Sequence, residues 1–192
     1  FVFSAMAFRN LLATNIYNQR TVFAGRLIYS AHNLDLQAET AFSELYHQPG
    51  IGTKNGKAIY VNGSYLIGFI TIGGAYKQYD KFQYRLNDLP MANYHNETLS
   101  DASASGEDEI GYQGFGTVNF TDNLNFTVDY AEAFNSDKDK KMNDAYFALE
   151  YLGNSYSLLA SYSQIEKIDD INSSWQQELL PALQSSFYLF NI

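Results

Sequence analysis

The chain has 192 residues, no cysteine, and 21 acidic against 12 basic side chains, which gives a formal net charge of −9. A sequence without cysteine excludes disulfides, cysteine–zinc sites and thiol nucleophiles, and the acidic balance argues against nucleic acid as a partner, because phosphates are neutralised by clustered Lys and Arg. Tyr and Phe are abundant, with 16 and 14 residues, whereas charged residues make up 17%, below the roughly 25% of typical soluble domains.

The two ends of the chain both look like strand interiors. Residues 1–8 (FVFSAMAF) are apolar but lack an initiator Met, a basic start and a cleavage site, so they do not resemble a signal peptide. Residues 185–192 also stop inside a β-like run. We therefore expect 1–192 to be a single β region that is a fragment of a longer chain.

The dominant period of the sequence is two, which predicts strands. Residues 22–30 and 34–43 form the clearest hairpin, joined by a connection at 31–34. One register places Arg26 opposite Glu39 on the polar face and Phe23 opposite Phe42 on the apolar face. Agreement of both faces in one register is what a hairpin requires.

The same pattern recurs along the chain. It predicts a hairpin within 57–79, with its turn between Asn62 and Gly68, and further hairpins at 110–134 and 145–164, with turns at 121–124 and 152–155. A last strand is expected over Ser174 to Leu180, before Pro181. No run approaches 18 consecutive apolar residues, so no transmembrane helix is expected. The sequence thus predicts an all-β fold of about ten antiparallel strands.

The predicted connections alternate in length. Short turns are followed by longer polar segments at 47–56, 85–109 and 135–143, and the acidic segment 85–109 is the longest. Unstructured loops of that length are uncommon in compact soluble domains. An up-and-down meander with short turns at one end and long loops at the other is typical of a transmembrane β-barrel.

Alternation alone does not separate a membrane barrel from a soluble β-sandwich, because both have one apolar and one polar face. Aromatic residues near predicted strand ends, such as Tyr29, Phe120 and Tyr156, favour a barrel with aromatic girdles. Predicted strands of about 9–11 residues are long enough to cross a bilayer when tilted. We expect a barrel, and the alternative is a soluble β-sandwich that binds glycans or protein partners.

Two segments carry a resemblance to a known class. GYQGFGTVNFTDNLNFTVDYAEAF and DAYFALEYLGNSYSLLASYSQIE resemble the strand–turn–strand units of Gram-negative outer-membrane β-barrels. The frequent Asn and Tyr are similar to those of porin-like barrels of the Bacteroidetes, although no specific family motif is present. Such barrels end in a terminal aromatic residue, whereas here Phe190 is followed by Asn191 and Ile192. The resemblance implies a location in the bacterial outer membrane.

Charged residues on the predicted polar face are candidates for a channel wall. Arg26, Asp35 and Glu39 form the clearest group. They are either a charged patch that selects solutes or a simple cross-strand ion pair without a functional role. Asp129 and Glu150 are paired carboxylates only if the fold brings them together, so catalysis there is not expected. The lumen-facing candidates are Arg26, Asp35, Glu39, Lys77, Asp129 and Glu150.

Other kinds of site have weak support. Asp101, Glu107, Asp108 and Glu109 offer oxygen ligands to a cation, but their spacing is not that of an EF-hand, and no metal or cofactor is expected. The three histidines, including His95, fall in predicted turns or loops without metal-ligand spacing. There is no G-x-S-x-G sequence. A hydrolase with a Ser–His pair assembled in space stays open, since such pairs are spatial.

The sequence favours a non-enzymatic, porin-like or transport-associated barrel with long extracellular loops. Its expected partners are the lipid bilayer, small solutes or ions, and other envelope proteins, and a net-acidic lumen would favour cations. A structural barrel subunit of an envelope complex is a further alternative.

Overall fold

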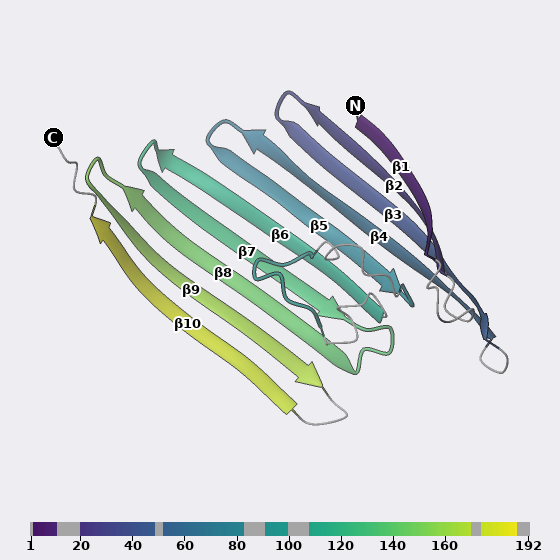
Figure 1. Ribbon diagram of the computed structural model, residues 1–192. Coiled ribbons are helices and arrows are strands. Elements are labelled where there is room, and N and C mark those ends of the chain that lie inside the picture. Colours follow the sequence, from purple (N-terminus) through teal and green to yellow (C-terminus); the bar gives the residue numbers. More distant parts are fainter. Residues whose placement is uncertain are drawn as a thin grey trace.

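The computed structural model describes residues 2–10, 20–48, 52–82, 91–99, 108–169 and 174–187. Within these residues, ten strands form one antiparallel sheet in which each strand pairs with its neighbours in the chain (Figure 1). The strands are β1 (Val2–Asn10), β2 (Arg20–Ala31), β3 (Leu34–Gln48), β4 (Gly52–Ile67), β5 (Ile70–Asp80), β6 (Asp108–Thr121), β7 (Leu124–Phe134), β8 (Lys140–Leu152), β9 (Tyr156–Asp169) and β10 (Ser174–Phe187).

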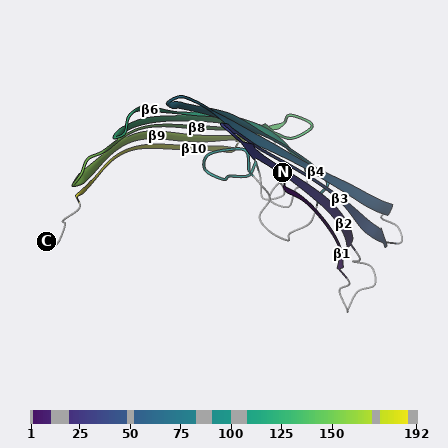
Figure 2. The same cartoon turned by 90° about the horizontal axis from the view of Figure 1, so that it is seen from above.

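The sheet is strongly curved and single-layered. Figure 2 shows it bent into an arch, with β1 and β10 at its two edges. The described strands make one sheet and not two packed sheets, so the β-sandwich alternative does not describe this fold. No helix in the described residues is long and apolar enough to cross a membrane.

The predicted first hairpin is confirmed in its register. In the β2–β3 pair, Arg26 faces Glu39 and Phe23 faces Phe42. The connection is shorter than expected, because only His32 and Asn33 lie between the strands, and His32 has a φ of 55°. Both faces of the hairpin therefore follow from the period-two pattern.

The other short turns lie at the same end of the sheet (Figure 1). The turn that the sequence left open between Asn62 and Gly68 is formed by Gly68 and Phe69. Gly68 has a φ of 60°, a left-handed conformation that glycine adopts without steric cost. Two further turns follow β6 and β8.

The predicted long segments are shorter than expected, except one. β3 ends at Gln48 and β4 begins at Gly52, and β8 begins at Lys140, so most of 47–56 and part of 135–143 are strand. The long connection runs over 81–107 and not 85–109. Polar residues in these regions pair across strands, as Asn55 does with Glu44 and Asn143 with Glu166, so the backbone ladder continues where the composition suggests a loop.

β10 continues through Pro181, which was expected to end it. Pro181 pairs with Tyr162 of β9, and the strand runs on to Phe187. Proline has no N–H to donate to a neighbouring strand, and in the described sheet β10 has a neighbour on one side only. An edge position therefore tolerates this residue.

The two faces of the sheet differ in chemistry. The segment 91–99 lies inside the arch (Figure 2) and contacts Asp144 and Ser163, so the face with these residues is the concave one. Large apolar side chains are exposed on the opposite, convex face, with Phe23 at 56% and Phe42 at 55%. Others on the convex face are Leu27, Leu36, Val61, Tyr65, Ile72, Tyr76, Tyr112, Tyr130, Phe147, Leu149 and Leu158.

Candidate functional site

Residues 91–99, called here the inner segment, belong to the long connection between β5 and β6 and lie against the concave face. Apolar contacts hold this connection at two described points. Phe82, just after β5, packs with Val22, Ala58 and Tyr79. Leu99, at the end of the inner segment, packs with Ala133 and Met142. The sequence predicts a long extracellular loop here, and the described part of this connection folds back onto the concave face of the sheet.

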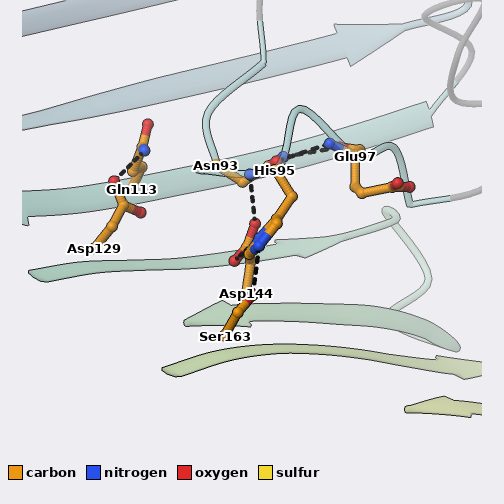
Figure 3. Close-up of polar contacts among 7 residues, drawn as sticks. All are labelled: Asn93, His95, Glu97, Gln113, Asp129, Asp144 and Ser163. Carbon is orange, nitrogen blue, oxygen red and sulfur yellow. Dashed lines mark hydrogen bonds and ion pairs between the residues drawn. The ribbon is translucent and has the colours of Figure 1, made fainter. Parts of the chain in front are cut away.

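His95 is the principal polar anchor of the inner segment. Its backbone N–H donates to Asp144 Oδ2 at 3.1 Å, and its Nδ1 lies 2.7 Å from Asp144 Oδ1. On the other side of the ring, Ser163 Oγ lies 2.5 Å from His95 Nε2. Figure 3 shows the imidazole directed from the inner segment toward these two strand residues. One loop residue is thereby bound to both β8 and β9.

Glu97 and Asn93 shape the turn around His95. The Glu97 N–H donates to Asn93 Oδ1, and Asn93 Nδ2 donates to the Glu97 carbonyl, both at 2.8 Å (Figure 3). Lys167 of β9 donates from Nζ to Glu97 Oε2 at 2.7 Å. The side chains are partly exposed, so the ion pair contributes mainly by fixing the position of the segment.

An aromatic pair adds to these contacts. The rings of Tyr94 and Tyr146 stack with centroids 3.7 Å apart and planes 10° from parallel. Burial, followed by the neighbouring Tyr146 hydroxyl, raises the pKa of Tyr94 to about 12. The phenol of Tyr94 is therefore neutral at physiological pH.

Lys77 and Glu109 form a buried ion pair beneath the inner segment. Lys77 Nζ lies 2.5 Å from Glu109 Oε1, and neither side chain is exposed. Lys77 Nζ also contacts Met91 Sδ at 3.3 Å. The pair joins β5 to β6 at the two ends of the long connection. The ion pair therefore links the end of β5 to the start of β6, on either side of the long connection.

The other predicted wall residues lie on the same concave face. Arg26 Nε is 3.0 Å from Glu39 Oε1, and Asp35 accepts from Ser30 Oγ at 2.5 Å. The Arg26–Glu39 contact is the simple cross-strand ion pair that the sequence predicts as the alternative to a functional group on a channel wall. The group lies on β2 and β3, whereas His95, Asp144 and Ser163 join the inner segment to β8 and β9.

Asp129 and Glu150 do not form a pair. In the β7–β8 register, Asp129 faces Tyr146 and Glu150 faces Asn125. They are thus displaced by four residues, or roughly 13 Å along the strands. Asp129 is 5% exposed and accepts from Gln113 Nε2 at 2.7 Å. Two carboxylates so far apart do not act on one bond.

The weak metal candidates do not gather. Asp101 and Glu107 lie outside the described residues. Asp108 and Glu109 are in β6 and not in a loop, so their side chains point to opposite faces. Asp108 accepts from Ser136, and Glu109 pairs with Lys77. No group of three or more potential ligands occurs among the described residues.

The array of His95, Asp144 and Ser163 was missed as a named site. The partners are 49 and 68 residues from His95 in the chain, and no local motif connects them. The only indication in the sequence was general: a Ser–His pair can be formed by residues that are far apart in the chain. Only the docking of the inner segment on β8 and β9 brings these residues together.

Carboxylates outnumber cations on the part of the concave face whose side chains are described. The cations Arg26, Lys77 and Lys167 each pair with a carboxylate, whereas Asp35 and Asp129 accept from neutral donors. The carboxylates here are Asp35, Glu39, Glu97, Glu109, Asp129, Asp144 and Glu150, against Arg26, Lys77, Lys140 and Lys167. Such a wall is chemically suited to attract positive charge.

Neither a protein-family model nor a curated protein matches this chain. Among solved structures, it is similar to the outer-membrane channel DcaP of Acinetobacter baumannii, with 11% identity, a TM-score of 0.63, and coverage of 95% of this chain and 61% of that one. It is also similar to the outer-membrane expressed OmpT of Vibrio cholerae, with 13% identity, a TM-score of 0.51, and coverage of 95% and 58%.

These similarities concern the fold. At 11% and 13% identity they establish that the sheet has the architecture of bacterial outer-membrane β-barrels. The chain spans about three fifths of the length of the two structures. The all-β antiparallel meander that the sequence predicts, with the barrel as its fold class, is confirmed.

Proposed function

We propose that this chain forms most of the wall of a porin-like channel in the bacterial outer membrane, without enzymatic activity as its main role. The convex face would contact lipid, since its large exposed side chains are apolar and aromatic. The concave face would line the passage of small solutes. Envelope partners and an origin in the Bacteroidetes stay predictions from the sequence.

The observation that carries the proposal is the inner segment on the concave face. A segment folded onto the inner face of a barrel narrows the passage through it. Contacts from β5, β7, β8 and β9 hold the segment at its two ends and its middle. A segment fixed in this way would set the width of the opening.

The charge of the wall supports a preference for cations. Asp35, Asp129 and Glu150 lie on the concave face with no Lys or Arg paired to them among the described contacts. Fixed carboxylates in a narrow passage attract cations and repel anions. We therefore propose that small cationic or neutral solutes pass more readily than anions.

Closure of the wall is also part of the proposal. β1 and β10 are not paired with each other in the described sheet. The chain covers 61% of the length of the DcaP channel. We propose that additional strands of a longer chain complete the barrel, since a closed barrel leaves no unpaired edge in lipid.

Conductance of the full-length protein in planar bilayers tests this function. We expect discrete conductance steps, and a reversal potential under a salt gradient that indicates cation preference. In a variant with residues 91–99 replaced by a Gly/Ser linker of equal length, the steps should become larger because a fixed obstruction is removed. Equal steps in both proteins would contradict a narrowing role for the inner segment.

A folded barrel that inserts but never conducts would favour the structural subunit of an envelope complex. Electrophoresis with and without boiling distinguishes this outcome from misfolding, because a folded barrel migrates differently before heating. A heat-modifiable protein with no conductance would therefore replace the channel proposal, whereas loss of heat modifiability would mean that the sample was not folded.

A further inference from the structure

Three side chains at the inner segment have an arrangement that a channel does not require. Ser163 Oγ is 2.5 Å from His95 Nε2, and His95 Nδ1 is 2.7 Å from Asp144 Oδ1 (Figure 3). A serine on one ring nitrogen and a carboxylate on the other is the order of groups that activates a serine nucleophile. Holding the inner segment against the strands would need only one of these two contacts.

The carboxylate fixes both the position and the tautomer of the imidazole. Asp144 is fully buried, and it accepts from the backbone N–H of His95 as well as facing its ring. A carboxylate accepts hydrogen bonds only, so Nδ1 must carry the proton. In the neutral imidazole, Nε2 is then the acceptor for the Ser163 hydroxyl, and this is the form that acts as a general base.

We infer that Ser163, His95 and Asp144 form a hydrolytic site for small carboxylic esters inside the passage. Ser163 Oγ bonds to the carbonyl carbon of the ester while its proton moves to His95 Nε2. The C–O bond to the alcohol breaks, and His95 returns the proton to the departing oxygen. Asp144 is a positioning residue that orients the imidazole.

Water completes the cycle without any oxidant or reductant. A water molecule transfers a proton to His95 Nε2 and bonds to the carbonyl carbon of the acyl-serine. The bond from that carbon to Ser163 Oγ breaks, and the oxygen regains the proton from His95. The net reaction converts an ester and water to a carboxylic acid and an alcohol.

The substrate class follows from the position of the site. Ser163 lies on the concave face, while its neighbours Tyr162 and Gln164 belong to the convex face. The reacting ester must therefore come from the aqueous interior and not from acyl chains in the bilayer. Tyr146 is the cross-strand partner of Ser163 and stacks on Tyr94. This pair offers an apolar surface beside the nucleophile, which favours esters with an aryl or short alkyl group.

Labelling of the folded, full-length protein in detergent with a fluorophosphonate probe tests the inference, with the modified residue located by peptide mass spectrometry. Ser161 is the matched control, because it lies on the same strand and the same face but faces Ala148. General-base activation accelerates a step by roughly 10²–10⁴-fold, so Ser163 should react at least about 100 times faster than Ser161. Equal reactivity of the two serines would overturn the inference.

The roles of the other two residues need a readout that loosening of the inner segment would not produce. In Asp144→Asn, the maximal rate constant of labelling should fall by about 10³–10⁴-fold because the tautomer is wrong. The probe concentration for half-maximal rate should stay unchanged. His95→Gln should likewise abolish fast labelling. Labelling that is fast in both variants would also overturn the inference.

Hydrolysis of p-nitrophenyl acetate gives the second measurement. Ser163→Ala should lose the activity while Ser161→Ala keeps it, and both should stay heat-modifiable. Conductance of the same samples separates the two proposals, because Ser163→Ala leaves the contacts between His95 and Asp144 in place. A protein that conducts but neither labels nor hydrolyses would retain the channel function and refute the hydrolytic site.

Discussion

At the scale of single residues, the Lys77–Glu109 ion pair has the largest desolvation cost among the ion pairs described above. Both side chains are fully buried, and Lys77 Nζ lies 2.5 Å from Glu109 Oε1. Removing two charges from water costs several kcal/mol per ion, and their mutual attraction offsets this only while both are present. Either charge alone would be buried without compensation.

We expect Glu109→Gln to destabilise the folded protein by about 3–5 kcal/mol, because it leaves the Lys77 ammonium without a counter-ion. The double variant Lys77→Met with Glu109→Met should recover most of this loss, since two apolar side chains need no partner. Urea unfolding in detergent micelles, followed by tryptophan fluorescence, measures both effects.

The exposed pair Arg26–Glu39 is the matched control. Its side chains are 47% and 31% exposed, and exposed ion pairs contribute at most about 1 kcal/mol. Arg26→Ala should therefore change the unfolding midpoint little. If Glu109→Gln is equally mild, the Lys77–Glu109 pair is hydrated in solution.

The two pairs also show what the sequence can predict at this scale. The contact of Arg26 with Glu39 follows from one hairpin whose register is fixed by both faces. The contact of Lys77 with Glu109 spans the long connection, and Glu109 stands in an acidic run that reads as loop. Its burial depends on β6 starting at Asp108, which composition alone does not reveal.

At the scale of the strand, adjacent residues of β8 test the assignment of the faces. Leu149 is 46% exposed on the convex face, and Glu150 lies on the concave face. Leu149→Lys should cost roughly 2–4 kcal/mol if it lies near the bilayer midplane, and it should reduce assembly into the outer membrane. Heat-modifiable protein in membrane fractions is the measurement.

Glu150→Lys is the control for this prediction. It places the same side chain one residue further along, but on the face that we assign to the aqueous passage. Assembly should remain close to that of the wild type. If the two variants assemble equally well, the assignment of the convex face to lipid is wrong.

The docking of the inner segment can be tested by cross-linking, since the native chain has no cysteine. Tyr94 stacks on Tyr146, so a variant with cysteine at both positions should be joined by a short bismaleimide. Cysteines at 94 and 147 should not be joined, because Phe147 points to the convex face. Gel mobility after denaturation reports the cross-link, and linkage of both pairs would mean that the segment leaves the wall.

The strands and the inner segment differed in how far the sequence could predict them. Alternation places β2 and β3 well because each apolar residue has a fixed neighbour across the ladder. The inner segment has no period, and its anchors come from strands that lie far along the chain. The acidic composition correctly indicated a long connection, expected over 85–109 and found over 81–107, but nothing in it indicated that residues 91–99 lie on the concave face.

At the scale of the whole molecule, the distribution of charge between the two faces distinguishes a selective passage from an acidic protein in general. The net charge of −9 was evident from the sequence, but its placement depends on the register. Asp129 and Glu150 lie on the concave face, whereas Asp108 lies on the convex face near the long connection.

Neutralising the concave carboxylates should weaken the cation preference that we propose. We expect Asp129→Asn combined with Glu150→Gln to shift the reversal potential in a salt gradient toward zero, because fixed charge inside a narrow passage determines which ion enters. Asp108→Asn removes a charge from the opposite face and should leave the reversal potential unchanged. A shift in the Asp108 variant as large as that in the double variant would mean that overall surface charge sets selectivity, and that the concave face does not act as the filter.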